Sequence, residues 1–189
     1  MFVSLLRGEG AFFLLSSNAL TAIKKPVWEK VCAIDSVRSR ISRIYKLDCE
    51  KGVTNIYPDT AWQDGFIEWD EGLSGEATYI CQIPPISKGE YRVNLGQVLH
   101  YAKVYVDGKK VGESTLYPYV VALDGIKGGE ELKIVVANTP ANECARSDYF
   151  DKHLPKDVGP YHANMVIAEA REGAGGLFGP IMIERNINA

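Results

Sequence analysis

Hydrophobic and polar residues alternate in several short segments of this chain, and turn-forming residues separate the segments. Leu132, Ile134 and Val136 occupy every second position of residues 132–138, so they share one face of a predicted strand. The same β-branched and aromatic character marks residues 77–83, 91–95 and 181–184. Because turn signals recur about every 8–12 residues, the pattern predicts an all-β fold, built as an antiparallel β-sandwich.

The sharpest local signal is Asp107-Gly108, which separates two strand-like segments at residues 102–106 and 109–112. A two-residue Asp-Gly loop suits the positive φ angles of a type I′ turn, so these segments are expected to form a tight hairpin. The predicted cross-strand pairs are Val104 with Val111 and Tyr105 with Lys110.

Three segments are less clearly patterned. Residues 36–47 carry apolar side chains near helical spacing, but a strand starting at Ile41 fits them almost as well. Residues 2–6 and 11–15 fit a hairpin better than a signal peptide, because Arg7 and two glycines interrupt the apolar run. Residues 142–176 form a long polar connection, with one or two helical turns expected near 165–171, and such connections are usually functional or mobile.

Composition and charge narrow the classes of partner. The 189 residues are 46% hydrophobic and 24% charged, which is typical of a globular domain with its own core. A net charge of −3 offers nothing that attracts a polyanion, so nucleic acid is excluded as a partner. No apolar run approaches the roughly 20 residues of a membrane span. None of the four cysteines stands in a C-x-x-C pair, and free thiols are favoured over disulfides.

Several segments together resemble the sugar-binding β-sandwich of glycoside hydrolases, in which an "LG" strand precedes a V-x-V-N-G-x-x-V-G hairpin. The matching segments are, in order, residues 74–79, 93–98, 102–112, 117–119, 128–134, 137–142 and 176–181. The last of these is similar to the closing strand of the C-terminal module in α-L-rhamnosidase-type enzymes, and family 2-type glycosidases carry related modules. Asp107 replaces the usual Asn of the hairpin, and both residues tolerate the left-handed conformation.

The resemblance implies a galactose-binding-like jelly roll over residues 46–189, with residues 1–45 as a β-rich segment, the tail of a preceding domain. It also implies two partners, a carbohydrate and a glycosidase catalytic domain, and a periplasmic or extracellular location. In such enzymes the catalytic residues lie on a separate barrel domain, and no segment of this sequence fits such a barrel. The expected function is therefore a non-catalytic carbohydrate-binding or ancillary module. The alternatives are a purely structural sandwich and a small stand-alone glycosidase.

A carbohydrate site needs an aromatic platform for the apolar face of a sugar and polar groups for its hydroxyls. The residues that meet this description in predicted loops are Trp62, Tyr117, Tyr119, Asn138, Asn142, Tyr161 and His162. We expect the site on the loops at one end of the sandwich, because the predicted sheet faces offer few flat aromatic surfaces. Trp69 is interpreted as packing, since large aromatic side chains in sandwiches are more often buried.

Metal binding and catalysis have little support in the sequence. His100, His153 and His162 are spread singly, so no metal site and no cofactor are predicted, and calcium is a minor alternative without a D-x-D-x-D loop. Glu68 and Asp70 would share one face of a strand, as paired carboxylates in a glycosidase must. The stretch around them is more typical of a solvated acidic loop, so no catalytic residue is assigned.

Overall fold

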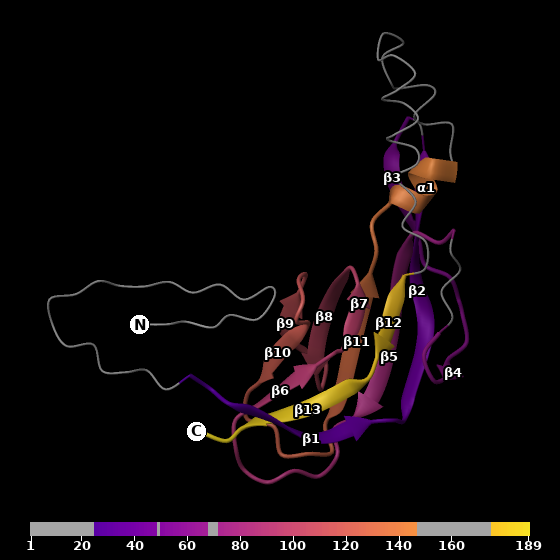
Figure 1. Ribbon diagram of the computed structural model, residues 1–189. Coiled ribbons are helices and arrows are strands. Elements are labelled where there is room, and N and C mark those ends of the chain that lie inside the picture. The colour runs from indigo at the N-terminus through magenta and orange to yellow at the C-terminus, as the bar shows by residue number, and fades with distance from the viewer. Residues whose placement is uncertain (1–24, 49, 68–71, 147–174) are drawn as a thin grey trace, which may run out of the picture.

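The computed structural model describes residues 25–48, 50–67, 72–146 and 175–189, which form two facing β-sheets (Figure 1). The smaller sheet has the order β1 (Trp28–Ile34), β13 (Ile181–Asn186), β6 (Tyr91–Asn94) and β10 (Val120–Leu123). The larger sheet has the order β3 (Gly52–Ile56), β2 (Val37–Asp48), β5 (Gly75–Gln82), β11 (Glu131–Ala137), β8 (Tyr101–Val106) and β9 (Lys109–Ser114), and β4 (Gln63–Asp64) pairs with β2. A short ribbon joins β7 (Gln97–Leu99) to β12 (Gly176–Gly179), and the helix α1 (Ala141–Arg146) follows β11.

The core lies between the two sheets and is built by alternation along each strand. In β11 the side chains of Leu132, Ile134 and Val136 are fully buried, whereas Lys133 and Val135 between them face outward. Ile181 and Ile183 of β13 meet this layer from the smaller sheet. Since all strand pairs within the sheets are antiparallel, the predicted antiparallel β-sandwich is confirmed.

Tyr79 of β5 ties the β7–β12 ribbon to this core. Its ring is fully buried, and its hydroxyl accepts a hydrogen bond of 3.2 Å from the backbone N–H of Leu177. Burial raises the pKa of Tyr79 to about 12, so its hydroxyl keeps its proton at neutral pH. The ribbon therefore closes one end of the sandwich through a neutral polar contact.

The Asp107-Gly108 turn forms as predicted, with φ angles of +46° and +77°. Tyr105 lies opposite Lys110, also as predicted, but the predicted pairing of Val104 with Val111 is wrong. A bulge shifts the register, so Val104 lies opposite Gly112. A Cβ atom on Gly112 would stand only 2.4 Å from Cγ1 of Val121, so the bulge places the residue without a side chain against β10.

Residues 37–48 form one strand, which settles the choice between helix and strand at this position. β2 runs across the boundary predicted between residues 45 and 46 and pairs with β5, while β1 pairs with β13. Residues 28–45 are thus hydrogen-bonded into both sheets. The expected hairpin at residues 2–15 and the helical turns near 165–171 lie outside the described residues. No helix in the described part of the chain is long and apolar enough to span a membrane.

Candidate functional site

A cavity of about 360 Å³ opens on the outer side of the smaller sheet, next to three loops. Strand residues form its floor, and residues from the β6–β7, β9–β10 and β12–β13 connections form its wall. The lining residues are Lys30, Asn94, Gly96, Gln97, Tyr117, Tyr119, Pro180 and Met182. Such a volume lies within the range of small-molecule sites in proteins.

The aromatic wall is held in place by backbone hydrogen bonds. The N–H of Leu95 donates to the carbonyl oxygen of Tyr119 over 2.9 Å, which fastens the β9–β10 loop to the end of β6. The N–H of Val120 donates to the carbonyl oxygen of Pro118, also over 2.9 Å. Tyr119 is half-buried, whereas 62% of Tyr117 is exposed. The loop therefore presents one anchored and one open phenol ring.

Gly96 brings the β6–β7 connection against the β12–β13 connection. Its φ angle is +67°, and a Cβ atom there would stand 2.3 Å from the carbonyl oxygen of Gly179. Any larger residue would push the two connections apart, so this glycine is required by both its conformation and its surroundings. The close approach sets Pro180 into the cavity wall beside Gly96.

A polar network supports the floor of the cavity. The carboxylate of Glu184 accepts a hydrogen bond of 2.6 Å from Nε of Arg92 and one of 2.9 Å from Nδ2 of Asn94. Oδ1 of Asn94 accepts a further bond of 3.0 Å from the N–H of Gly96. The guanidinium of Arg92 lies 4.4 Å from the centre of the Trp28 ring. Both oxygens of a buried carboxylate are thus partnered, and the Asn94 side chain is oriented by two bonds.

The arrangement can hold a ligand with one apolar face and several hydroxyls. The Tyr117 ring offers an exposed flat surface, while Lys30 and Gln97 are exposed polar side chains on the cavity rim. Two further cavities, of about 460 and 470 Å³, have no aromatic residue in their lining. The cavity of about 460 Å³ includes Asp35 and Glu131 in its lining. Of these three cavities, the one at Tyr117 has aromatic residues in its lining.

Trp62 lies elsewhere, on the outer face of the larger sheet. Its ring centre is 4.7 Å from the guanidinium carbon of Arg40 and 5.9 Å from that of Arg38. Tyr105 on the same face lies beneath Lys133, and Trp28 lies on the smaller sheet. The expectation that the sheet faces offer few aromatic surfaces is therefore wrong, because outward strand positions and a covering loop supply several.

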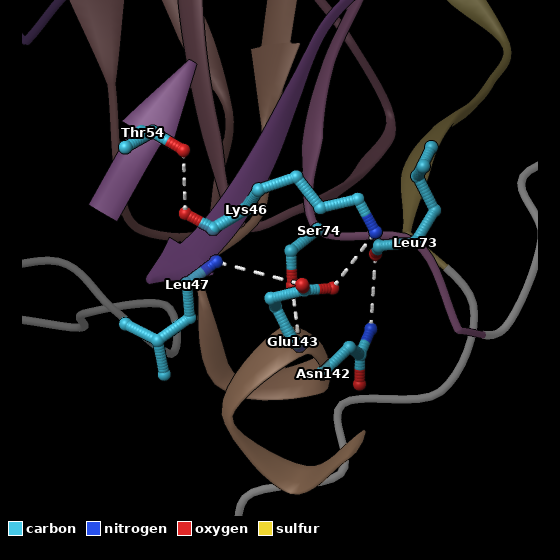
Figure 2. A network of polar contacts seen from close by, with 7 residues as sticks. All are labelled: Lys46, Leu47, Thr54, Leu73, Ser74, Asn142 and Glu143. Atoms are coloured by element: carbon cyan, nitrogen blue, oxygen red, sulfur yellow. Dashed lines mark hydrogen bonds and ion pairs between the residues drawn. The ribbon is translucent and has the colours of Figure 1, made fainter. Parts of the chain in front are cut away.

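Asn138 and Asn142 form part of a network that joins strands to α1, and Figure 2 shows Asn142 in it. Both are buried, and each donates from Nδ2 to the carbonyl oxygen of Leu73, over 2.7 Å and 3.1 Å. Oδ1 of Asn138 also accepts from the N–H of Gly75 over 2.8 Å. These amides hold backbone groups at the start of β5, and neither residue lines the cavity with Tyr117 and Tyr119.

Glu143 completes this network from the first turn of α1 (Figure 2). Its carboxylate pairs with Nζ of Lys46 at 3.3 Å, and its backbone N–H donates to Oγ of Ser74 over 3.0 Å. The helix is thereby fastened to β2 and to the residue before β5. A structural role accounts for these contacts.

Several predicted residues lie outside the described residues. These are Tyr161 and His162 of the candidate site, Trp69, and the acidic residues Glu68 and Asp70. Within the described ranges, no group of three or more His, Cys, Asp or Glu side chains could hold a metal ion.

Sequence reasoning missed Lys30, Asn94 and Gln97 as cavity residues. Asn94 stands between two inward positions, Val93 and Leu95, so strand alternation alone could have placed its side chain on the outer face. Nothing in the sequence near Lys30 signals its position, because β1 reaches the cavity only through its pairing with β13.

Comparison with known proteins supports the fold. No protein-family model matches this sequence, and no curated protein does. Among solved structures, the chain is similar to a rhamnosidase from Novosphingobium sp. PP1Y, with a TM-score of 0.54, 19% identity, and coverage of 89% of this chain and 16% of that one. It is also similar to a beta-glucuronidase from Faecalibacterium prausnitzii, with a TM-score of 0.50, 13% identity, and coverage of 88% and 33%.

The chain therefore spans a third or less of each of these two glycosidases. At such identities the likeness establishes the fold, and it confirms the resemblance to a glycoside-hydrolase-associated β-sandwich at that level.

Proposed function

We propose that this chain is a non-catalytic carbohydrate-binding module that accompanies the catalytic domain of a glycoside hydrolase. The observation that carries the proposal is the cavity at Tyr117, which combines an exposed aromatic ring with amide and ammonium groups. The fold it shares with a small part of two glycosidases supports the ancillary role. The ligand would contact loop and sheet residues together, because the cavity includes both.

Binding would rest on stacking and a few polar contacts. A sugar ring placed against Tyr117 would cover its exposed face, and Gln97 and Lys30 would reach hydroxyl groups at the ring edge. A shallow site of this kind gains only about 4–6 kcal/mol after the ordering costs, which corresponds to dissociation constants from about 1 mM to about 40 μM. Weak binding is useful when a tethered catalytic domain shares the same substrate.

Hydrolysis is not proposed for this cavity. Glycoside cleavage uses two carboxyl groups about 5–10 Å apart around the scissile bond. The described lining of the cavity contains no carboxylate, and both oxygens of the nearby Glu184 are engaged by Arg92 and Asn94. Turnover of aryl glycosides that is lost in Glu68→Gln or Asp70→Asn would contradict a non-catalytic role.

The second candidate function is mechanical support of a catalytic domain without sugar binding. The larger sheet favours it, because Trp62 and Tyr105 on its outer face are each approached by a cationic side chain. Such rings strengthen the module but present less open surface to a sugar. The two candidate functions differ in whether a sugar binds at Tyr117.

A titration with a panel of neutral and acidic mono- and oligosaccharides, followed by amide chemical shifts, tests the proposal. Shifts are expected at Gly96, Gln97 and Tyr117, and Tyr117→Ala should weaken binding about tenfold by removing the platform. Tyr117→Phe should keep most of the affinity, since the ring remains.

Trp62→Ala is the matched aromatic deletion on the other sheet and should leave the affinity unchanged. If no saccharide shifts the cavity resonances, the supporting role replaces the binding role. Shifts confined to the outer face of the larger sheet would mean that the site has been placed on the wrong side of the molecule.

A further inference from the structure

Lys30 is the one charged residue in the lining of the cavity at Tyr117. Lys30 is exposed and makes no ion pair with the other described residues. The remaining polar lining residues are neutral amides and phenols. The cavity surface thus carries an unneutralised positive charge, although the chain as a whole has a net charge of −3.

Glu184 is the carboxylate that could neutralise Lys30, since the two residues lie opposite each other on β13 and β1. It is already committed, because Arg92 holds one of its oxygens at 2.6 Å and Asn94 holds the other at 2.9 Å. The side chain of Glu184 is only 7% exposed, so this arrangement is fixed. Two cations therefore face one carboxylate, and the surplus charge is on the cavity side.

Hydrogen-bonding capacity points in the same direction. A lysine ammonium has three donors and no acceptor. Oδ1 of Asn94 accepts from Gly96, which uses part of the acceptor capacity on the cavity floor. A sugar hydroxyl can accept from this ammonium group, but it brings a donor of its own and no compensating charge. A carboxylate supplies acceptor oxygens and the opposite charge together.

We infer that the cavity selects a saccharide bearing a carboxylate, a uronic acid residue, over the neutral sugar of the same ring configuration. The sugar ring covers Tyr117, and its carboxylate pairs with Lys30 at the β1 side of the cavity. This inference rests on the proposed carbohydrate-binding function and adds the substrate class to it. Because Lys30 is exposed, the ion pair contributes to selectivity rather than to most of the affinity.

The test compares oligomers of galacturonic acid with galactose oligomers of matched linkage and length, and glucuronic acid with glucose, by calorimetry and amide shifts. At low ionic strength the acidic member of each pair should bind about fivefold more tightly, as expected for one solvent-exposed charge pair. Raising the salt to about 0.5 M should bring the ratio close to one, because screening acts over a few ångström at that concentration.

Lys30→Gln should remove the preference at low salt, because it should lower the affinity for the acidic sugar much more than the affinity for its neutral counterpart. Lys109→Gln is the control, since Lys109 is an exposed cation on β9 in the larger sheet, and it should keep the preference. Equal binding of acidic and neutral sugars by the unmodified chain would overturn the inference and leave the proposed function standing. A preference that survives in Lys30→Gln would overturn it as well. If no sugar binds at the cavity, the proposed carbohydrate-binding function is wrong, and the inference that rests on it fails with it.

Discussion

The outer faces of the two sheets carry similar side chains in different arrangements. On the larger sheet Arg40 lies 4.7 Å from the Trp62 ring and Lys133 lies 4.4 Å from the Tyr105 ring. On the smaller sheet Trp28 is approached by Arg92 in the same manner, but Tyr117 at the loop end remains 62% exposed. Trp62 and Tyr105 on the larger face are used for its own packing, whereas Tyr117 beside the smaller face is open. Tyr57 next to β3 is also 68% exposed, but its ring lies 5.2 Å from the guanidinium carbon of Arg43.

The Arg92–Glu184 pair of the smaller sheet is better buried than the Arg38–Asp64 pair at the β2–β4 edge of the larger sheet, which also has a part-buried pair of its own, Arg43 with Glu76 at 3.3 Å. Arg92 and Glu184 on the smaller sheet have side chains 24% and 7% exposed, and they meet at 2.6 Å. Arg38 and Asp64 on the larger sheet are 55% and 97% exposed, at 3.8 Å. A buried pair fixes the geometry around it, whereas an exposed pair contributes little. The rigid polar floor therefore lies beneath the candidate site.

Removing Glu184 should have the largest effect on stability. Glu184→Ala leaves Arg92 and Asn94 without their acceptor in a poorly hydrated position, so the free energy of unfolding should fall by about 2–3 kcal/mol. Asp64→Asn, the matched change on the larger sheet, should alter it by less than about 0.5 kcal/mol. Urea denaturation of both variants measures the difference. Equal losses would show that the two faces do not differ in this respect.

Trp62→Ala should have a moderate effect on stability and none on the cavity. The ring is half-buried and stacks on Arg40, so its loss should cost about 1–2 kcal/mol. Nε of Arg40 is buried without a hydrogen-bond partner in the described structure, and its exposure to water offsets part of the loss. Tyr117→Ala should leave the denaturation midpoint almost unchanged. A larger loss of stability in Tyr117→Ala than in Trp62→Ala would show that Tyr117, and not Trp62, is the ring that packs against the protein.

The sequence alone predicts the sheets well because their signals are local. Alternation places Leu132, Ile134 and Val136 in the core, and Asp107-Gly108 forms the tight turn that an Asp-Gly dipeptide favours. The error in the β8–β9 register has a non-local cause, since Gly112 must face Val121 of another strand. A pattern read along one strand contains no information about that contact.

The candidate site is harder to predict for a related reason. Polar residues in predicted loops look alike in sequence, but Asn138 and Asn142 bond backbone groups while Tyr117 stays open. Lys30 and Asn94 are 64 positions apart and meet only because β13 lies between β1 and β6. Composition identified the aromatic wall of the cavity, and strand order determined its floor.

The smallest expected effect concerns an exposed ionic contact of the larger sheet. Glu113 accepts hydrogen bonds from Lys110 and, over 2.6 Å, from the hydroxyl of Tyr101. These bonds, the one from Lys110 first, hold the pKa of Glu113 below its usual value. Its contribution to stability is therefore complete above the normal glutamate range and is lost as the pH falls through the lowered pKa. Because both side chains are about half exposed, salt should weaken the contact.

A titration of the Glu113 carboxyl carbon by NMR measures this directly. Its midpoint should rise toward the ordinary value in Lys110→Gln and also in high salt, since both remove the same attraction. Tyr101→Phe should produce a smaller rise, because it removes the weaker of the two hydrogen bonds. An unchanged midpoint in Lys110→Gln would mean that the cationic side chains of the larger face do not act on their acidic neighbours. The difference between the outer faces of the two sheets would then be limited to their aromatic rings and to Glu184.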